Sequence, residues 1–297
     1  MQVAFRTAED LSSAVDAVFR EIPVLLYHKL DAVAPYPGFQ SHNGIEMYYV
    51  ESGQGLYLVG DETYILEPGT LMIIRPFTLH KVLQTDANFN ICRSVLMWKE
   101  EFLLEGWPSQ EPFPLAHMPA DCCRVAFEPG QRSRISGILS HINAEWTERQ
   151  PGYLPVIRCL IQELLLLAYR RHQLAEQELT LPPAAQLPQE ISYLVQFISG
   201  HFQSELTLEE LSKLVHMNPS YLSSLFHKHV GLTITRFIAV KRIHYAKKLL
   251  RETEMPIADI AYQSGFNHPT YFTKTFKKQE PMTPAAYRKA HGSVGRG

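Results

Sequence analysis

Two stretches of the sequence, PSYLSSLFHK at residues 219–228 and PTYFTKTFKK at residues 269–278, repeat one pattern at an offset of 50 residues. They share Pro, Tyr, Phe and the final Lys, and upstream of them TLEELS at 207–212 matches PIADIA at 256–261. Each copy predicts a helix, a short turn and a second helix whose apolar stripe lies opposite a small, polar or basic face. The repeat therefore predicts two helix-turn-helix units, because two copies are too few for a helical solenoid.

Local start and stop signals support helices throughout this region. Thr207, followed three residues later by Glu210, is a capping box. Asn218 stands directly before a proline, which is a second helix start. A long helix is predicted from about Thr233 to Glu252, and Gly265 predicts a tight turn in the second unit.

Charge separates the two parts of the chain. Residues 188–297 contain 14 Lys and Arg against 8 Asp and Glu, a net charge of +6, whereas residues 1–187 contain 14 against 22, a net of −8. A basic domain favours a polyanionic partner, because each cation placed on a phosphate releases condensed counterions. A solvated basic surface without a partner is the alternative on charge alone.

The region from about residue 22 to 130 is typical of β-structure. Its apolar runs, MYYV (47–50), LYLV (56–59), YIL (64–66) and LMII (71–74), are separated by Gly, Pro and Asp turns. Several strands at roughly ten-residue spacing predict a barrel or sandwich.

From about residue 131 the apolar period becomes helical. The second helix of this segment has an additional apolar flank at Ile161, Leu165 and Ala168. Such a helix is buried, either in its own domain or against a partner subunit. The prolines within residues 173–189 then predict a linker.

The remaining composition excludes several classes of protein. The longest apolar run, Leu164 to Ala168 followed by Tyr169, is far shorter than the roughly 20 residues that span a bilayer. The N-terminus lacks the pattern of a secretory signal, and four irregularly spaced cysteines do not form a disulfide framework. We therefore expect a cytoplasmic protein with no membrane partner.

Four strings within residues 190–290 are more specific: YLSSLFHKHVG, KRIHYAKKLL, IADIAYQSGFNHPTYFTKTFKK and TPAAYRK. Together they closely resemble the DNA-binding unit of the AraC/XylS family of bacterial transcription regulators. The resemblance implies seven helices, with two helix-turn-helix subdomains joined by a long central helix. It also implies that both recognition helices enter successive major grooves, about 34 Å apart on one face of the DNA.

The same resemblance implies which side chains contact DNA. The groove-facing positions correspond to Ser220, Ser223, Ser224, Thr270, Thr273 and Lys274. Phosphate contact is expected near the helix ends, at His227, Lys228, Lys277 and Lys278. The second helix is expected to give the sharper sequence preference, because Lys pairs well with guanine while Ser and Thr are permissive. By spacing, seven residues are core instead: Leu211, Leu222, Phe226, Ile260, Phe266, Phe272 and Phe276.

Residues 39–82 resemble the cupin barrel that often precedes this unit. Metal-binding cupins supply three His and a Glu at positions that correspond here to Gln40, His42, Glu46 and His80. Of these, Gln40, His42 and Glu46 share parity, so on one strand they would face the same side. Because Gln is no metal-ligating His, we expect no metal and no other cofactor. A two-His-one-carboxylate site remains the alternative.

The barrel interior is the natural site for a small effector. Its polar candidates are His42, Glu46, Tyr48, Arg75 and His80. A sugar is the first candidate by analogy with other regulators of this layout.

The predicted fold is therefore α+β with two domains. It comprises a cupin-like effector-binding β-barrel (1–130), a helical dimerisation segment (131–175), a linker (176–189), an AraC-type DNA-binding domain with two helix-turn-helix motifs (190–291) and a flexible tail (292–297).

The leading hypothesis is an effector-controlled transcriptional regulator that has no catalytic residues. Its expected partners are promoter or operator DNA, a small effector, a second copy of the chain and, if it is an activator, RNA polymerase. A cupin enzyme with an appended DNA-binding domain would instead need iron, manganese or zinc at the barrel site. A constitutive DNA-binding protein with a purely dimerising barrel is the third possibility.

Overall fold

The structure, a computed structural model, describes residues 15, 18, 19, 21–31, 39–83, 90–177, 187–280 and 282–292. The chain divides into two compact units that consist mainly of Ser41–Ala185 and Gln186–Gly297. Most of the predicted linker and nearly all of the predicted tail lie outside the described residues.

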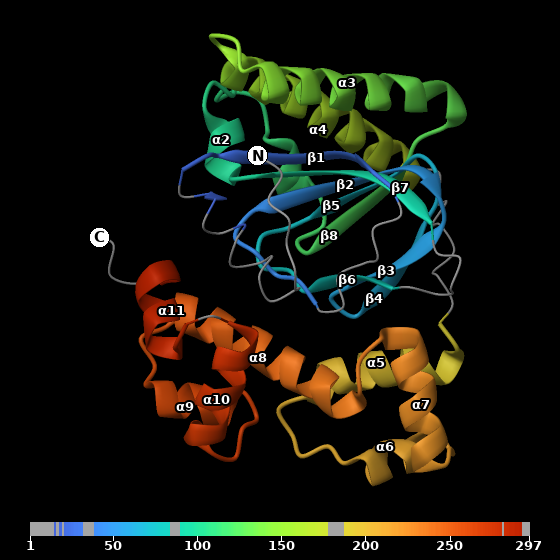
Figure 1. Ribbon diagram of the computed structural model, residues 1–297, viewed down its shortest axis with the longest axis vertical. Helices are drawn as coiled ribbons and strands as arrows, with labels where there is room; N and C mark the ends of the chain where they lie inside the picture. The colour runs from blue at the N-terminus through green and yellow to red at the C-terminus, as the bar shows by residue number, and fades with distance from the viewer. Residues whose placement is uncertain are drawn as a thin grey trace. The chain divides into compact units, whose positions relative to one another are not determined.

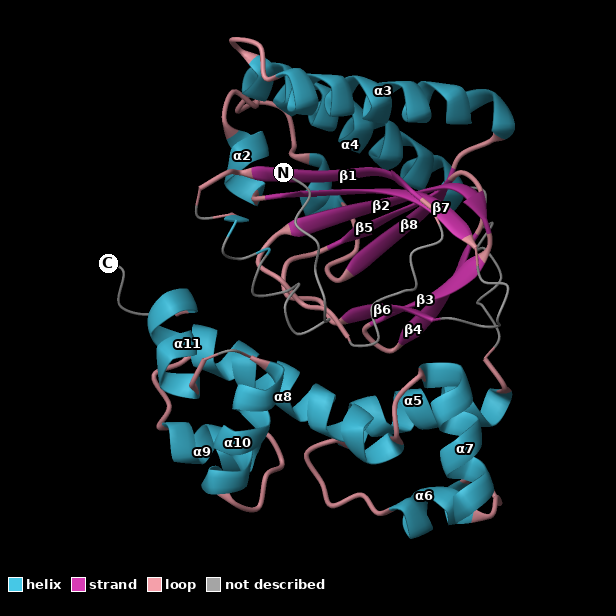
Figure 2. Cartoon of the chain, viewed as in Figure 1, coloured by secondary structure: helices cyan, strands magenta, loops and turns pink. Residues whose placement is uncertain are grey.

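In the described part of the first unit, eight strands form two antiparallel sheets (Figure 2). The five-stranded sheet has the order β1-β7-β2-β5-β8, and the three-stranded sheet has the order β4-β3-β6. The strands are β1 (Val24–Leu30), β2 (Ile45–Gly53), β3 (Gly55–Val59), β4 (Glu62–Leu66), β5 (Thr70–Ile74), β6 (His80–Leu83), β7 (Ile91–Trp98) and β8 (Cys122–Ala126). The apolar runs predicted as strands all lie within these elements, which confirms the β-rich domain.

Strand β2 is buried on both faces. Ile45, Met47 and Tyr49 belong to an apolar cluster that includes the helices outside the sheet. The alternate residues Glu46 and Tyr48 point the other way, into the space between the two sheets, because successive side chains alternate across a strand. One strand therefore supplies both an outer packing surface and an interior polar surface.

Two helices, α3 (Pro129–Glu148) and α4 (Tyr153–Gln177), pack against each other and cover the outer face of the larger sheet (Figure 1). Both apolar flanks of α4 are buried in this layer, through Ile157, Ile161, Leu164, Leu165 and Ala168. Packing within the domain accounts for the apolar character of α4, and dimerisation through this segment stays a prediction. The short elements α2 (Glu100–Leu104) and η1 (Pro114–His117) also contact α4.

The described part of the second unit contains seven helices, the number that the resemblance implies. They are α5 (Gln189–His201), α6 (Leu208–Leu214), α7 (Pro219–Val230), α8 (Ile234–Glu252), α9 (Ile257–Gln263), α10 (Pro269–Gln279) and α11 (Pro284–His291). The long central helix α8 links the two halves of this unit (Figure 1). It contacts α7 in the first half and both α9 and α10 in the second.

The predicted helix starts are confirmed. The Thr207 side chain accepts a hydrogen bond from the backbone N–H of Glu210, whose side chain accepts one from the N–H of Thr207. Asn218 caps α7 by accepting from the backbone N–H of Ser220. Each cap satisfies backbone donors that a helix N-terminus leaves without partners.

The apolar stripes of the second unit are buried as expected. All seven core residues predicted from spacing, Leu211, Leu222, Phe226, Ile260, Phe266, Phe272 and Phe276, are at most 2% exposed. Burying several large side chains is the main stabilising contribution in so small a helical unit. No helix in the described residues is both long and apolar enough to cross a membrane.

Candidate functional site

The two helix-turn-helix units have the same turn geometry. In the first unit, the backbone N–H of His216 donates to the carbonyl of Lys213, and that of Met217 donates to the carbonyl of Ser212. In the second unit, the N–H of Gly265 donates to the carbonyl of Tyr262, and that of Phe266 donates to the carbonyl of Ala261. His216 and Gly265 occupy matching positions, and both have positive φ, at 53° and 87°. The internal repeat therefore extends to the backbone, and a histidine takes the left-handed conformation that glycine adopts more easily.

The predicted base-contacting side chains lie on the open faces of α7 and α10. Ser220, Ser224, Thr270 and Lys274 are exposed, while Ser223 and Thr273 are half-buried. None of the six is part of the core, so all are placed where a groove could receive them. The hydroxyl of Thr273 donates to the Pro269 carbonyl at 3.0 Å, which leaves its oxygen as an acceptor.

Two tyrosines that the sequence analysis did not single out share these faces. Tyr221 is 59% exposed and Tyr271 is 57% exposed, and the repeat places them at matching positions of the two recognition helices. Exposure alone does not mark a role, since other tyrosines of this unit such as Tyr262 are equally open. Their identical place in both repeats was the signal available in the sequence.

The predicted phosphate contacts, His227, Lys228, Lys277 and Lys278, are all exposed. They lie in the last turns of α7 and α10. Cations at a helix C-terminus also complement its partial negative charge. These side chains are thus free to reach a neighbouring polyanion at little cost to the helices.

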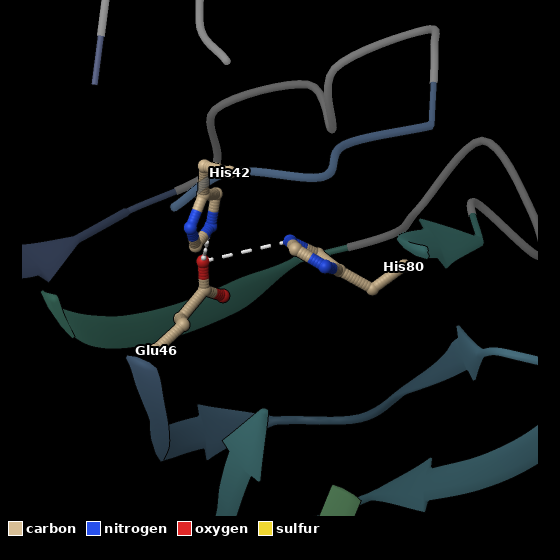
Figure 3. A group of neighbouring side chains, drawn as sticks. All are labelled: His42, Glu46 and His80. Carbon is tan, nitrogen blue, oxygen red and sulfur yellow. Dashed lines mark hydrogen bonds and ion pairs between the residues drawn. The ribbon is translucent and has the colours of Figure 1, made fainter. Parts of the chain in front are cut away.

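The first unit gathers three of the predicted effector residues inside the barrel (Figure 3). His42 Nε2 lies 3.0 Å from Glu46 Oε2, and His80 Nε2 lies 3.6 Å from the same oxygen. All three side chains are at most 2% exposed. The two imidazoles approach the Glu46 carboxylate from different sides, from the chain before β2 and from β6.

Neighbouring groups favour the ionised form of Glu46. The hydroxyl of Tyr57 donates to Glu46 Oε1 at 2.9 Å. Burial alone would raise the pKa of Glu46, but the charge of His80 and the hydrogen bond from His42 outweigh it, so the pKa lies well below its ordinary value. Glu46 is therefore a carboxylate inside the barrel.

The ring of His80 has a defined orientation. Its Nδ1 lies 2.8 Å from the carbonyl oxygen of Thr78, which only accepts, so Nδ1 carries a proton. His80 Nε2 therefore faces a carboxylate oxygen of Glu46 at 3.6 Å, beyond hydrogen-bond distance.

The structure corrects the parity argument for His42. The strand begins at Ile45, and His42 lies in an irregular stretch before a bend at residues 43 and 44, so His42 is not on the strand with Glu46. At Gly44 the bend packs so closely that an added Cβ would lie 2.3 Å from the Phe19 ring. His42 therefore reaches Glu46 from the segment before the bend, not from the same strand face.

The other candidates are placed differently. Tyr48 is buried in the interior, with its ring centroid 5.0 Å from that of Tyr57. Arg75 is half-buried and donates to the carbonyls of Leu115 and Pro119, so it does not join the histidine cluster. Gln40 is also half-buried and has no contact with Glu46 among the described interactions.

The donor set of the cluster fits a metal ion. The candidate ligand atoms of His42, Glu46 and His80 all lie within 4.8 Å of one another. The bond from His80 Nδ1 to a carbonyl is the arrangement that orients metal-ligating histidines, and Nε2 has no hydrogen-bond partner among the described residues. Two histidines and a carboxylate with open positions suit a transition metal.

Comparisons with known proteins match both parts of the chain. A family model described as a helix-turn-helix domain matches residues 211–290, and one described as a cupin domain matches residues 29–88. The uncharacterized HTH-type transcriptional regulator YtdP of Bacillus subtilis is 39% identical over 101 residues, which are 34% of this chain and 13% of the relative.

Two further relatives differ in coverage. The melibiose operon regulatory protein of Escherichia coli is 32% identical over 99 residues, 33% of each chain. The HTH-type transcriptional activator RhaR of Salmonella dublin is 24% identical over 250 residues, 84% of this chain and 86% of the relative. This chain thus spans a minor part of the YtdP and melibiose regulators and most of RhaR.

These matches agree with the fold. The cupin match falls on the sheets of the first unit, and the helix-turn-helix match falls on the duplicated helices of the second. The chain therefore carries a cupin domain ahead of an AraC-type helix-turn-helix domain, and relatives that it matches are regulators of the AraC family.

Proposed function

We propose that the protein is a sequence-specific DNA-binding transcriptional regulator whose activity is controlled by a small effector in the barrel. The observation that carries the DNA-binding part is the pair of recognition helices, α7 and α10. Each buries its apolar stripe and leaves its polar face open, and both belong to the basic part of the chain. Such faces can enter a major groove without disturbing the core.

Fluorescence anisotropy with a promoter fragment tests this function at two salt concentrations. We expect affinity to fall steeply as salt rises, because phosphate contacts release counterions. Binding that does not respond to salt, or no binding to promoter DNA, would contradict the proposal.

Lys274→Ala is expected to reduce the preference for the specific site over random DNA by about tenfold or more, since a lysine in the groove reads guanine. Lys278→Ala is expected to weaken binding to the specific site and to random DNA equally. It should also reduce the slope of log affinity against log salt concentration by about 1, since one phosphate contact is lost. Lys289→Ala, an exposed lysine on α11, is the control and should change neither. Equal weakening on all sequences by Lys274→Ala would show that this lysine contacts phosphate only.

The barrel is the effector site in this proposal. An effector alters DNA binding only if its affinity differs between the two functional states. The effector class is proposed to be a sugar or a sugar derivative, in line with the name of the melibiose relative. We further propose that the regulator acts as a homodimer in the cytoplasm and is not an enzyme.

A metal-dependent cupin enzyme is the second candidate, because His42, Glu46 and His80 converge. A bound metal would supply Lewis-acid chemistry, and these three residues would hold it. Elemental analysis of protein purified without chelator tests this. Stoichiometric iron, manganese or zinc, together with a melting temperature that falls in a chelator, would favour the enzyme. Substoichiometric metal would remove it.

A further inference from the structure

Arg93 is a buried cation in the barrel interior that the sequence analysis did not identify. It lies on β7 and pairs in register with Val50 of β2. Directly opposed residues of antiparallel strands point to the same face, so Arg93 shares the inward face of β2 with Tyr48 and Glu46. Its guanidinium carbon lies 6.0 Å from the centroid of the Tyr48 ring, and the residue is only 7% exposed.

No carboxylate of the described residues forms an ion pair with Arg93, and no hydrogen bond of its guanidinium is found among them. Glu46 lies on the same inward face of β2, but its oxygens already accept from Tyr57 and His42. A buried charge without a hydrogen-bonded counter-ion is costly. The contact with the Tyr48 ring offsets only part of this cost.

Tyr48 adds a second donor at the same place. Its hydroxyl is buried and has no hydrogen-bond partner among the described residues. A phenol is protonated at neutral pH, so this hydroxyl can donate. The unpartnered phenol O–H of Tyr48 thus lies beside the Arg93 guanidinium, a group with five N–H donors.

We infer that the barrel binds a small polyhydroxy monocarboxylate, whose carboxylate accepts hydrogen bonds from Arg93 and Tyr48. A carboxylate is the acceptor that matches a guanidinium in shape and charge, through two parallel N–H···O bonds. This inference rests on the proposed function, because it names the chemical class of the effector in the same interior.

The opposite end of the interior sets the rest of the ligand. There the Glu46 carboxylate oxygens accept hydrogen bonds from His42 and Tyr57, so this end offers acceptor oxygens that suit a hydroxyl donor better than a second carboxylate. Two strand residues, about 7 Å, separate Glu46 from Tyr48, a distance that an open six-carbon chain can span. The site is therefore expected to bind a ligand with one carboxylate more tightly than a ligand with no carboxylate or with two.

A matched set of open-chain probes tests the class directly. Gluconate and galactonate carry one carboxylate, glucitol and galactitol carry none, and glucarate and galactarate carry two. We expect at least one of the monoacids to raise the melting temperature of the full chain by mass action, and its neutral and dicarboxylate counterparts to bind at least tenfold more weakly. The inference is overturned if neither monoacid binds, or if a counterpart binds equally well.

Arg93→Met tests the residue even without ligand. Removing a buried charge that has no ion pair among the described residues is expected to leave the melting temperature of the free protein unchanged or higher, and to weaken monoacid binding at least tenfold. Arg171→Met is the matched control. This arginine of α4 donates to the Ala126 carbonyl and lies beside Glu128, so its loss should lower the melting temperature and leave the monoacid affinity unchanged. A loss of stability in Arg93→Met equal to that of Arg171→Met would overturn the inference.

DNA binding separates this inference from the proposed function. Arg93→Met is expected to bind promoter DNA in the absence of ligand as the wild-type chain does. If the wild type binds DNA but no monoacid, only the ligand class is wrong. If the wild type fails to bind DNA, the regulatory function itself is wrong, whichever probes bind.

Discussion

Glu280→Gln is expected to destabilise the second unit by about 3–5 kcal/mol, the usual cost of removing one member of a buried ion pair. Glu280 follows α10, and its Oε1 accepts a hydrogen bond from Nζ of Lys247 on α8. The two side chains are 10% and 7% exposed. The glutamine is nearly the same size, so the change removes the charge and leaves the volume. The lysine then stays buried without its carboxylate.

Urea denaturation of the full chain, monitored by circular dichroism, measures this loss. Glu252→Gln makes the same change at an exposed position of α8 and should alter the unfolding free energy by less than about 0.5 kcal/mol. The double variant Lys247→Met, Glu280→Leu should recover most of the stability, because apolar residues of similar size can replace a buried pair. A small effect of Glu280→Gln alone would show that the pair contributes little.

Gly265→Ala is expected to destabilise the second helix-turn-helix by about 2–4 kcal/mol, through backbone strain and a steric clash. Gly265 has φ of 87°, and an added Cβ would lie 2.8 Å from both Cα and O of Gln203 and 2.9 Å from Nε of Arg242. That Nε donates to the Phe202 carbonyl, so the clash also threatens a hydrogen bond that joins α8 to the end of α5. Specific DNA affinity should fall with stability.

Two other substitutions serve as controls in the same melting experiment. Gly200→Ala lies in helix α5 with nothing within 4 Å of the added Cβ. It should raise stability by about 0.5–1 kcal/mol, because alanine is the better helix former. His216→Gly removes a side chain from the matching left-handed position of the first unit and should be neutral or stabilising. Equal losses in Gly265→Ala and Gly200→Ala would refute the role given to the turn.

The second unit could be predicted from sequence because its signals are local. The Thr207 capping box and the Asn218 cap act within three residues, and the apolar stripes repeat every three or four residues. The internal repeat then supplied the pairing of helices that periodicity alone does not give. The left-handed turn at His216 was missed, because only a few per cent of residues other than glycine adopt positive φ.

The barrel site could be predicted only in part because its geometry is set by distant strands. The resemblance placed His42, Glu46 and His80 together, and the structure brings them into contact. It did not place Arg75, which bonds to backbone carbonyls elsewhere. Arg93 was missed because alternation along β7 separates two faces without saying which one is interior. Only the register with β2 decides that.

The alternation along β2 has a consequence for how such chains can diverge. Ile45, Met47 and Tyr49 hold the helical layer, while Glu46 and Tyr48 set the chemistry of the cavity side. The even-numbered side chains of β2 can therefore be exchanged without loosening the contact between the sheet and the helices that cover it.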